Sequence, residues 1–267
     1  MSPLARLRTL LSAEPIFAAG GLVLLFLAAP LLAAAWLDPR LFNGINIWIK
    51  PLKFTASLSL FLLTLAAIAP LLRPGFVRSR PFRIYAGVVL AAIAFEMVVI
   101  VGAAALGTAS HFNVATPLAA RLYTAMGVLA VVLTTASAVY AWALWRAGRG
   151  RTWPVLHDAL VLGLALVLPL TLVTAFTLGG NDGHWVGGTR SDAGGLALFG
   201  WSRDGGDLRV AHFFATHAMH FIPAAAVAAG LLLGPARRWP AWVAAAALVA
   251  LVGFSFSQAL QGRPFLT

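Results

Sequence analysis

Residues 84–106 read IYAGVVLAAIAFEMVVIVGAAAL, an apolar run whose single charged side chain is that of Glu96. A helix needs about 20 consecutive apolar residues to cross the hydrocarbon core of a bilayer, so this run predicts a membrane-spanning helix. Ionisable groups inside a bilayer are costly, usually face the interior of a helix bundle and mark function. The run therefore predicts a membrane protein and gives a first candidate for its functional site.

Six further apolar runs of similar length predict a seven-helix bundle. They cover residues 16–36, 48–72, 117–145, 153–178, 208–233 and 239–260. The composition agrees, because 61% of the residues are hydrophobic and 10% are charged, whereas about 25% are charged in soluble domains. No polar stretch is long enough for a soluble domain, so we expect an all-α, polytopic membrane protein with a single domain over residues 1–267.

The net charge of +11 comes from basic residues in the short loops between these runs. That pattern orients membrane helices, so we expect a lipid bilayer and no nucleic acid as the partner. The positive-inside rule places the basic loops and the N-terminus in the cytoplasm and the C-terminus outside, as in a bacterial inner membrane. The basic residues are Arg6, Arg8, Arg73, Arg78, Arg80, Arg83, Arg146, Arg149, Arg151, Arg237 and Arg238.

Tryptophans at the ends of the runs support this topology, since indole rings favour the headgroup level of a bilayer. They are Trp36, Trp48, Trp145, Trp153, Trp239 and Trp242. The chain has no cysteine, which excludes disulfides, thiolate metal sites and iron–sulfur clusters.

A long glycine-rich outer loop is predicted over residues 179–207. It has no helix or strand periodicity, and we expect a flexible connection, with a lid over the outer mouth of the bundle as the alternative. Asp207 is well placed to cap the first turn of the following span, because its carboxylate can accept the free amide hydrogens there.

Histidines in the 208–233 span lie at the depth of Glu96. With a rise of 1.5 Å per residue, Glu96 is about 15 Å from the outer end of its span, His217 about 13 Å and His220 about 18 Å. A rotation of 100° per residue places His217 and His220 on one face, with His212 nearer the outer surface. These residues predict a polar pocket in the outer half of the bundle.

Basic residues surround the mouth of this predicted pocket. Lys50 and Lys53 lie on one face of the second span, because they are three residues apart. Arg121 is near the start of the fourth span, and His111 lies in an outer connection. The three long basic side chains are candidates for binding a ligand, and the alternative is that they extend to the interface as such side chains do near span ends.

Three functions compete for the pocket. The first is metal-based redox chemistry, with Glu96, His217 and His220 as ligands that suit iron, zinc or copper, and with His212 and His111 as further candidates. The second is a b-type haem, held between His111 and His212 or between His217 and a methionine, either Met97 or Met126.

The third is a proton-coupled transporter or a sensor of a small polar or anionic ligand, because buried Glu and His side chains form proton relays. A transporter would continue its polar route toward the cytoplasm, with His157 and Asp158 as candidates. A non-catalytic subunit of a homo- or hetero-oligomer is a further alternative, since Gly230 and Gly234 form a G-x-x-x-G pattern that permits close helix approach.

Three stretches, IWIKPLKF (47–54), SHFNVATP (110–117) and GWSRDGGDLRVAHFFATHA (200–218), resemble an uncharacterised family of bacterial multi-span integral membrane proteins over most of the chain. In that family a glutamine is usual where this chain has His220, and the resemblance transfers no function. It implies that the distinctive residues are on the outer side, namely Lys50, Lys53, His111, Asp207, Arg209, His212 and His217. Of these, Asp207 and Arg209 are further candidates for binding a ligand.

The layout is also coarsely similar to cytochrome oxidase subunit III. That subunit has a glutamate in its third span and an H-x-x-H pattern in its sixth, as this chain has with Glu96 and His217–His220. The tryptophan- and histidine-rich last span of the subunit is missing here.

Overall fold

A computed structural model of the chain describes residues 12–181 and 183–266. Arg6 and Arg8, which contribute to the predicted orientation, lie outside the described residues. The chain divides into two compact units, one ending at Ala136 and the other beginning at Ser137. We describe each unit by itself. Helix α5 (Pro117–Ala147) runs from the first unit into the second.

Six of the described helices are long and apolar enough to cross a bilayer. A seventh span results if the bent pair α7 (Leu208–Thr216) and α8 (Ala218–Leu233) is counted as one. The chain is therefore a helical protein with several candidate membrane spans, as the apolar runs predict.

The described residues of the first unit form three complete helices and the beginning of α5. They are α2 (Pro15–Leu37), α3 (Ile49–Ile68), which continues into the short 3-10 helix η1 (Ala69–Leu71), and α4 (Arg80–Leu106). Helix α4 starts four residues before its apolar run because Ser79 caps it, with the hydroxyl accepting a hydrogen bond from the Phe82 amide.

Close packing of α2 against α3 and α4 depends on two glycines. A Cβ atom at Gly21 would lie 2.7 Å from Cγ of Leu63, and one at Gly20 would lie 2.6 Å from a methyl carbon of Leu90. The buried hydroxyl of Ser59 donates a hydrogen bond of 2.8 Å to the Gly21 carbonyl. Small residues at membrane helix interfaces allow such close approach of the backbones.

A short hairpin joins α2 to α3. Strands β1 (Leu41–Phe42) and β2 (Ile45–Asn46) pair antiparallel. The turn is Asn43-Gly44, in which both residues have a positive φ, of 52° and 82°. Asn-Gly is the preferred pair for such two-residue hairpin turns. The part of the first unit beside this hairpin, where α3 begins and α4 ends, is called the hairpin end below.

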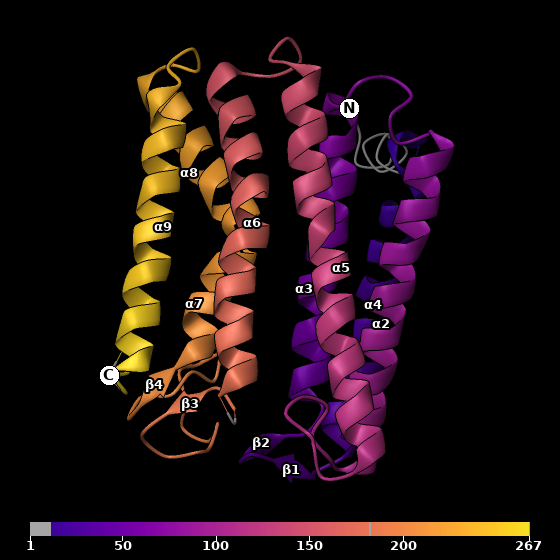
Figure 1. Cartoon of the computed structure of the whole chain (residues 1–267), viewed down its shortest axis with the longest axis vertical. Helices are drawn as coiled ribbons and strands as arrows, with labels where there is room; N and C mark the ends of the chain where they lie inside the picture. Colours follow the sequence, from indigo (N-terminus) through magenta and orange to yellow (C-terminus); the bar gives the residue numbers. More distant parts are fainter. Residues whose placement is uncertain (1–11, 182, 267) are drawn as a thin grey trace. The chain divides into compact units, whose positions relative to one another are not determined.

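The second unit contains α6 (Pro154–Gly180), α7, α8 and α9 (Trp239–Leu260), together with the last part of α5. Figure 1 shows α7 and α8 as two separate segments that lie between α6 and α9, with α7 near strands β3 and β4. Helix α6 packs against all three of the helices that follow it.

The predicted continuous span over 208–233 is broken. Helices α7 and α8 meet at His217 with a bend of 62°. Pro223 removes one amide hydrogen from the helical ladder and crowds the carbonyl four residues before it. Thr216 also bonds back, through its hydroxyl, to the carbonyls of His212 and Phe213, which bends helices. The break packs against Gly163 of α6, where a Cβ atom would lie 3.0 Å from the Ala218 carbonyl oxygen.

The G-x-x-x-G pattern of α8 serves the packing and the ending of the helix inside this chain. A Cβ atom at Gly230 would lie 3.1 Å from a methyl carbon of Val155 on α6. Gly234 ends α8 with a φ of 97°. The pattern therefore gives no separate support to an oligomer.

The long loop contains a short strand pairing that its sequence pattern did not indicate. Its first two residues belong to α6, and strands β3 (Trp185–Val186) and β4 (Gly206–Asp207) form a two-residue antiparallel ribbon. Glycine is required within it, because a Cβ atom at Gly205 would lie 2.6 Å from the Gly187 carbonyl oxygen.

Candidate functional site

Glu96 on α4 is a buried carboxyl group with an unsatisfied oxygen. Its side chain is 3% exposed, and Oε1 has no hydrogen-bond partner among the residues that the structure describes. The other buried acids among the described residues of the whole chain accept hydrogen bonds from backbone amides or basic side chains. These are Glu14, Asp158, Asp192 and Asp207.

Lys50 and His111 form a polar pair in the same unit. Nζ of Lys50 lies 3.2 Å from Nδ1 of His111, and Oγ of Ser110 lies 3.1 Å from the same nitrogen. An ammonium group is a hydrogen-bond donor and cannot accept, so Lys50 donates and Nδ1 of His111 accepts. The charge of Lys50 also acts on the Glu96 carboxyl group. Glu96, Lys50 and His111 are called the Glu96 site below.

Aromatic rings surround His111. The centroids of Phe54, Phe112 and Tyr123 lie 5.5, 6.4 and 6.1 Å from that of the imidazole. Lys50 Nζ lies 6.0 Å from the Phe54 centroid. Rings lower the local polarity, which strengthens interactions between the charges they enclose. Phe112 has a φ of 57°, a left-handed conformation that is uncommon for a residue other than glycine and often accompanies a functional site.

The Glu96 site is at the hairpin end, and the buried residues that α3 and α4 contribute farther from that end are apolar, whereas Glu14 before α2 and Thr134 on α5 are buried polar residues elsewhere in the unit. The exception on α3 is Ser59, whose hydroxyl is used by Gly21. The remaining buried residues there are Phe61, Leu62, Leu65, Ala66 and Ile68 on α3 and Phe82, Ala86, Val89, Ala92 and Ile93 on α4.

The other basic candidates of this unit differ in their surroundings. Lys53 is half-buried one turn after Lys50, whereas Arg121 on α5 is exposed. The predicted ring of three basic residues therefore reduces to Lys50 in direct contact with His111, with Lys53 close in sequence and Arg121 at the surface.

In the second unit each predicted histidine contacts another polar side chain. Nδ1 of His212 lies 3.0 Å from Oγ1 of Thr174 on α6. Nδ1 of His217, at the break between α7 and α8, lies 3.2 Å from Nδ1 of His220. The His217 ring also packs on Phe213, with 4.5 Å between centroids.

No group of three or more His, Asp or Glu side chains within the described ranges has an arrangement that could hold a metal ion. The predicted metal site joins Glu96 of the first unit with His217 of the second, and one haem alternative joins His111 with His212. Because these residues belong to separate units, their convergence stays a prediction. So does the pairing of His217 with either methionine.

Asp207 and Arg209, which were ligand-binding candidates, fasten the loop. Asp207 caps α7 as predicted, with its carboxylate accepting the Arg209 amide at 3.0 Å. The Arg209 guanidinium contacts Asp207 at 2.6 Å and Asp192 at 2.7 Å. Burial opposes the ionisation of Asp192, but the hydrogen bond from His184 and the charge of Arg209 outweigh it and lower the pKa of Asp192.

Asp158, a candidate for a polar route, is fully engaged. Its carboxylate accepts from Nε of Arg149 at 3.0 Å and from Nε of Arg238 at 2.6 Å. The neighbouring His157 ring contacts the same carboxylate at 3.4 Å and the Leu144 carbonyl at 3.3 Å. This cluster ties α6 to the connections before α6 and before α9.

The aromatic residues around His111, namely Phe54, Phe112 and Tyr123, and the neighbouring Ser110 were not among the predicted site residues. The signal was present in the SHFNVATP stretch, where Ser110 and Phe112 flank His111, and in Phe54, four residues after Lys50 on one helix face. No family model, curated protein or solved structure is similar enough to this chain to count as a match.

Proposed function

We propose that this chain is a membrane sensor that binds a small anion at the Lys50–His111 pair and takes up a proton on Glu96 as it does so. The observation that supports this proposal is the unsatisfied, buried oxygen of Glu96 beside the charge of Lys50. A buried carboxylate oxygen without a donor costs free energy, and protonation lowers that cost because it removes the buried negative charge.

The coupling between anion and proton follows from the charges. Lys50 carries one positive charge, which a deprotonated Glu96 balances. An arriving anion would compete with Glu96 for Lys50 and would be repelled by it, at a cost on the order of a few kcal/mol between neighbouring charges. Protonation of Glu96 removes this repulsion and leaves Lys50 to the anion. Binding should therefore tighten as the pH falls.

A sensor is favoured over a transporter because the buried polar groups of α3 and α4 end part of the way along these two helices. The buried residues of α3 and α4 beyond the site are apolar, and Asp158 is occupied by two arginines. Seven spans, a cytoplasmic N-terminus and a bacterial inner membrane are parts of the same proposal. They would place the hairpin end, and thus the anion, on the outer side.

The test is calorimetric titration of the purified protein in detergent with sulfate and with acetate, which do not titrate near neutral pH. Lys50→Gln should weaken binding at least about tenfold, because a charge-assisted hydrogen bond contributes about 1.5–3 kcal/mol. Arg121→Gln is the matched control, since Arg121 is exposed, and it should bind as the wild type does. An unchanged affinity in Lys50→Gln would refute the proposal.

A second candidate function is metal-dependent, and one distance favours it. The 3.2 Å between the two Nδ1 atoms of His217 and His220 is close to the roughly 3.3 Å that separates two histidine nitrogens on a tetrahedral zinc ion. The test is elemental analysis with an absorption spectrum of the purified protein. A stoichiometric metal or a haem Soret band that is lost in His217→Ala would establish this function, and a colourless, metal-free protein would argue against it.

A further inference from the structure

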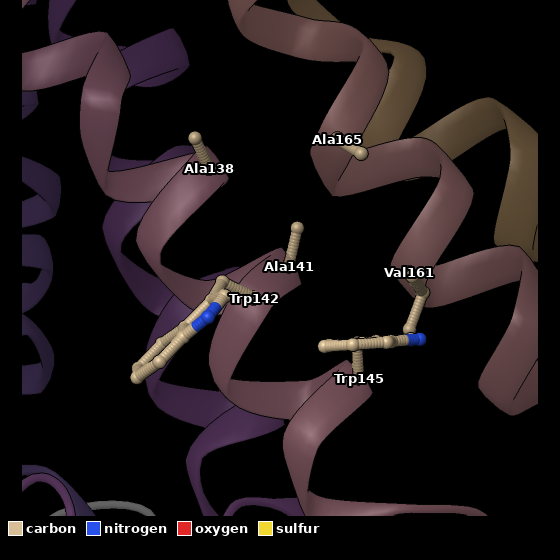
Figure 2. A pocket seen from close by; sticks show the side chains of 6 residues that line it. All are labelled: Ala138, Ala141, Trp142, Trp145, Val161 and Ala165. Atoms are coloured by element: carbon tan, nitrogen blue, oxygen red, sulfur yellow. The ribbon is translucent and has the colours of Figure 1, made fainter.

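An apolar groove lies between the last turns of α5 and the neighbouring part of α6, within the second unit. Short side chains leave it as a shallow, open depression, and two tryptophans border it (Figure 2). In Figure 2 the ring of Trp145 extends from α5 toward Val161 of α6. The lining residues are Ala138, Ala141, Trp142, Trp145, Val161 and Ala165.

The tryptophans indicate where this groove sits in a bilayer. Trp142 is 55% exposed and Trp145 63% exposed, and exposed indole rings favour the headgroup level. Trp153, Trp239 and Trp242, which are near the same ends of the helices of this unit, are also exposed. From Trp145 the groove runs to Ala138, about 10 Å along the helix axis and into the hydrocarbon.

Positive charge collects at the same end of the unit. The connections before α6 and before α9, with the last turn of α5, carry five arginines, and the acid beside them is Asp158, which pairs with two of the five. One of the remaining arginines, Arg146, lies with its guanidinium 5.7 Å from the Trp142 ring, at the border of the groove. The five are Arg146, Arg149, Arg151, Arg237 and Arg238.

We infer that the groove binds one acyl chain of an anionic phospholipid whose phosphate lies against Arg146. The apolar lining suits a hydrocarbon chain, and guanidinium groups bind phosphate with paired hydrogen bonds. Basic pockets between membrane helices bind anionic headgroups in this way. A second copy of the chain would bring its own arginines against these, so charge disfavours a homodimer on this face. This inference is independent of the Glu96 site.

The experiment is native mass spectrometry of the full chain after removal of lipid, with phosphatidylglycerol or phosphatidylcholine of identical acyl chains added back. The wild type should retain phosphatidylglycerol about fivefold better, the factor that one arginine near an anionic surface supplies. Arg146→Gln should abolish this preference by removing the headgroup contact. Ala165→Phe should abolish it by filling the groove, since Ala165 is an exposed residue of its lining.

Matched controls separate these effects from general changes in charge and size. Ala250→Phe adds the same ring to an exposed position of α9, and Arg78→Gln removes an exposed arginine of the first unit. Both should keep the wild-type preference. Equal retention of the two lipids by the wild type would overturn the inference. A preference that survives Ala165→Phe would also overturn it, because the lipid would then bind the arginines without the groove.

Discussion

Replacing Gly163 by alanine tests the packing of the broken helix against α6. The new Cβ atom would lie 3.0 Å from the Ala218 carbonyl oxygen, 3.1 Å from Cα of Met219 and 3.3 Å from Cδ of Pro223. Two of these three atoms belong to the backbone, so α6 and α8 must separate by a few tenths of an ångström. Overpacking of this kind costs about 1–3 kcal/mol.

The helix itself opposes that cost, because alanine is about 1 kcal/mol more favourable than glycine within a helix. The net loss expected for Gly163→Ala is therefore about 0–2 kcal/mol. Gly253→Ala is the matched control in the same unit, since a Cβ atom at Gly253 of α9 meets no atom within 4 Å. It should gain stability, which separates the two variants by about 1–3 kcal/mol.

The assay is unfolding of the purified protein by titration with sodium dodecyl sulfate, followed by circular dichroism. Gly163→Leu extends the series, because its larger side chain meets the same backbone, and it should be less stable than Gly163→Ala. The reasoning is refuted if Gly163→Ala is as stable as Gly253→Ala, since the close contact between α6 and the break would then not exist.

Three further predictions concern the second unit. Asp158→Asn removes the carboxylate that holds two arginines and should lower the free energy of unfolding by about 1–3 kcal/mol, measured in the same detergent titration. Arg209→Lys loses the two-point contact with the carboxylates of Asp192 and Asp207, so the amides of residues 183–207 should exchange hydrogen faster. The anion affinity of the Glu96 site should not change. A reduced anion affinity would contradict the role of Arg209 in fastening the loop. Burial lowers the pKa of His184 below its ordinary value, against its hydrogen bond to Asp192. The fold therefore favours the neutral ring, so the loop should be most protected above a pH of about 6.5 and should lose protection as the pH falls toward 5. His184→Gln should remove this step, and a step that persists would assign it to another group.

Much of the fold could be predicted because the thickness of a bilayer sets the length of each apolar run. The run at 239–260 coincides with α9, and the run at 84–106 ends where α4 ends. The position of the break at His217 could not be predicted in the same way. The break depends on Pro223, six residues later, and on the packing of the neighbouring residues against Gly163. Gly163 precedes His217 by 54 positions in the sequence.

The hairpin between α2 and α3 has a clear signal in the sequence. Asn43-Gly44 between short apolar segments is a strong local indication of a two-residue turn, and the structure has this turn. It matters for the site because the hairpin leads into Lys50 at the start of α3.

The candidate site could be predicted only in part. Helical spacing places Lys50 and Lys53 on one face, but it does not say which neighbouring helix that face meets. The contact of Lys50 with His111 therefore required the structure. For Asp207 and Arg209 the short separation in sequence was the relevant signal, because oppositely charged residues two positions apart at a helix start pair with each other.

The measurement that tests the proposed function most directly is the number of protons taken up when the anion binds. It is obtained by calorimetric titration with sulfate or acetate at pH 7 in two buffers with different heats of ionisation. The proposal predicts a net proton uptake by the wild type, with one proton per bound anion as its upper limit, and none by Glu96→Gln, because linkage assigns the proton to that carboxylate. Binding without proton uptake in the wild type, or the same uptake in Glu96→Gln, would contradict it.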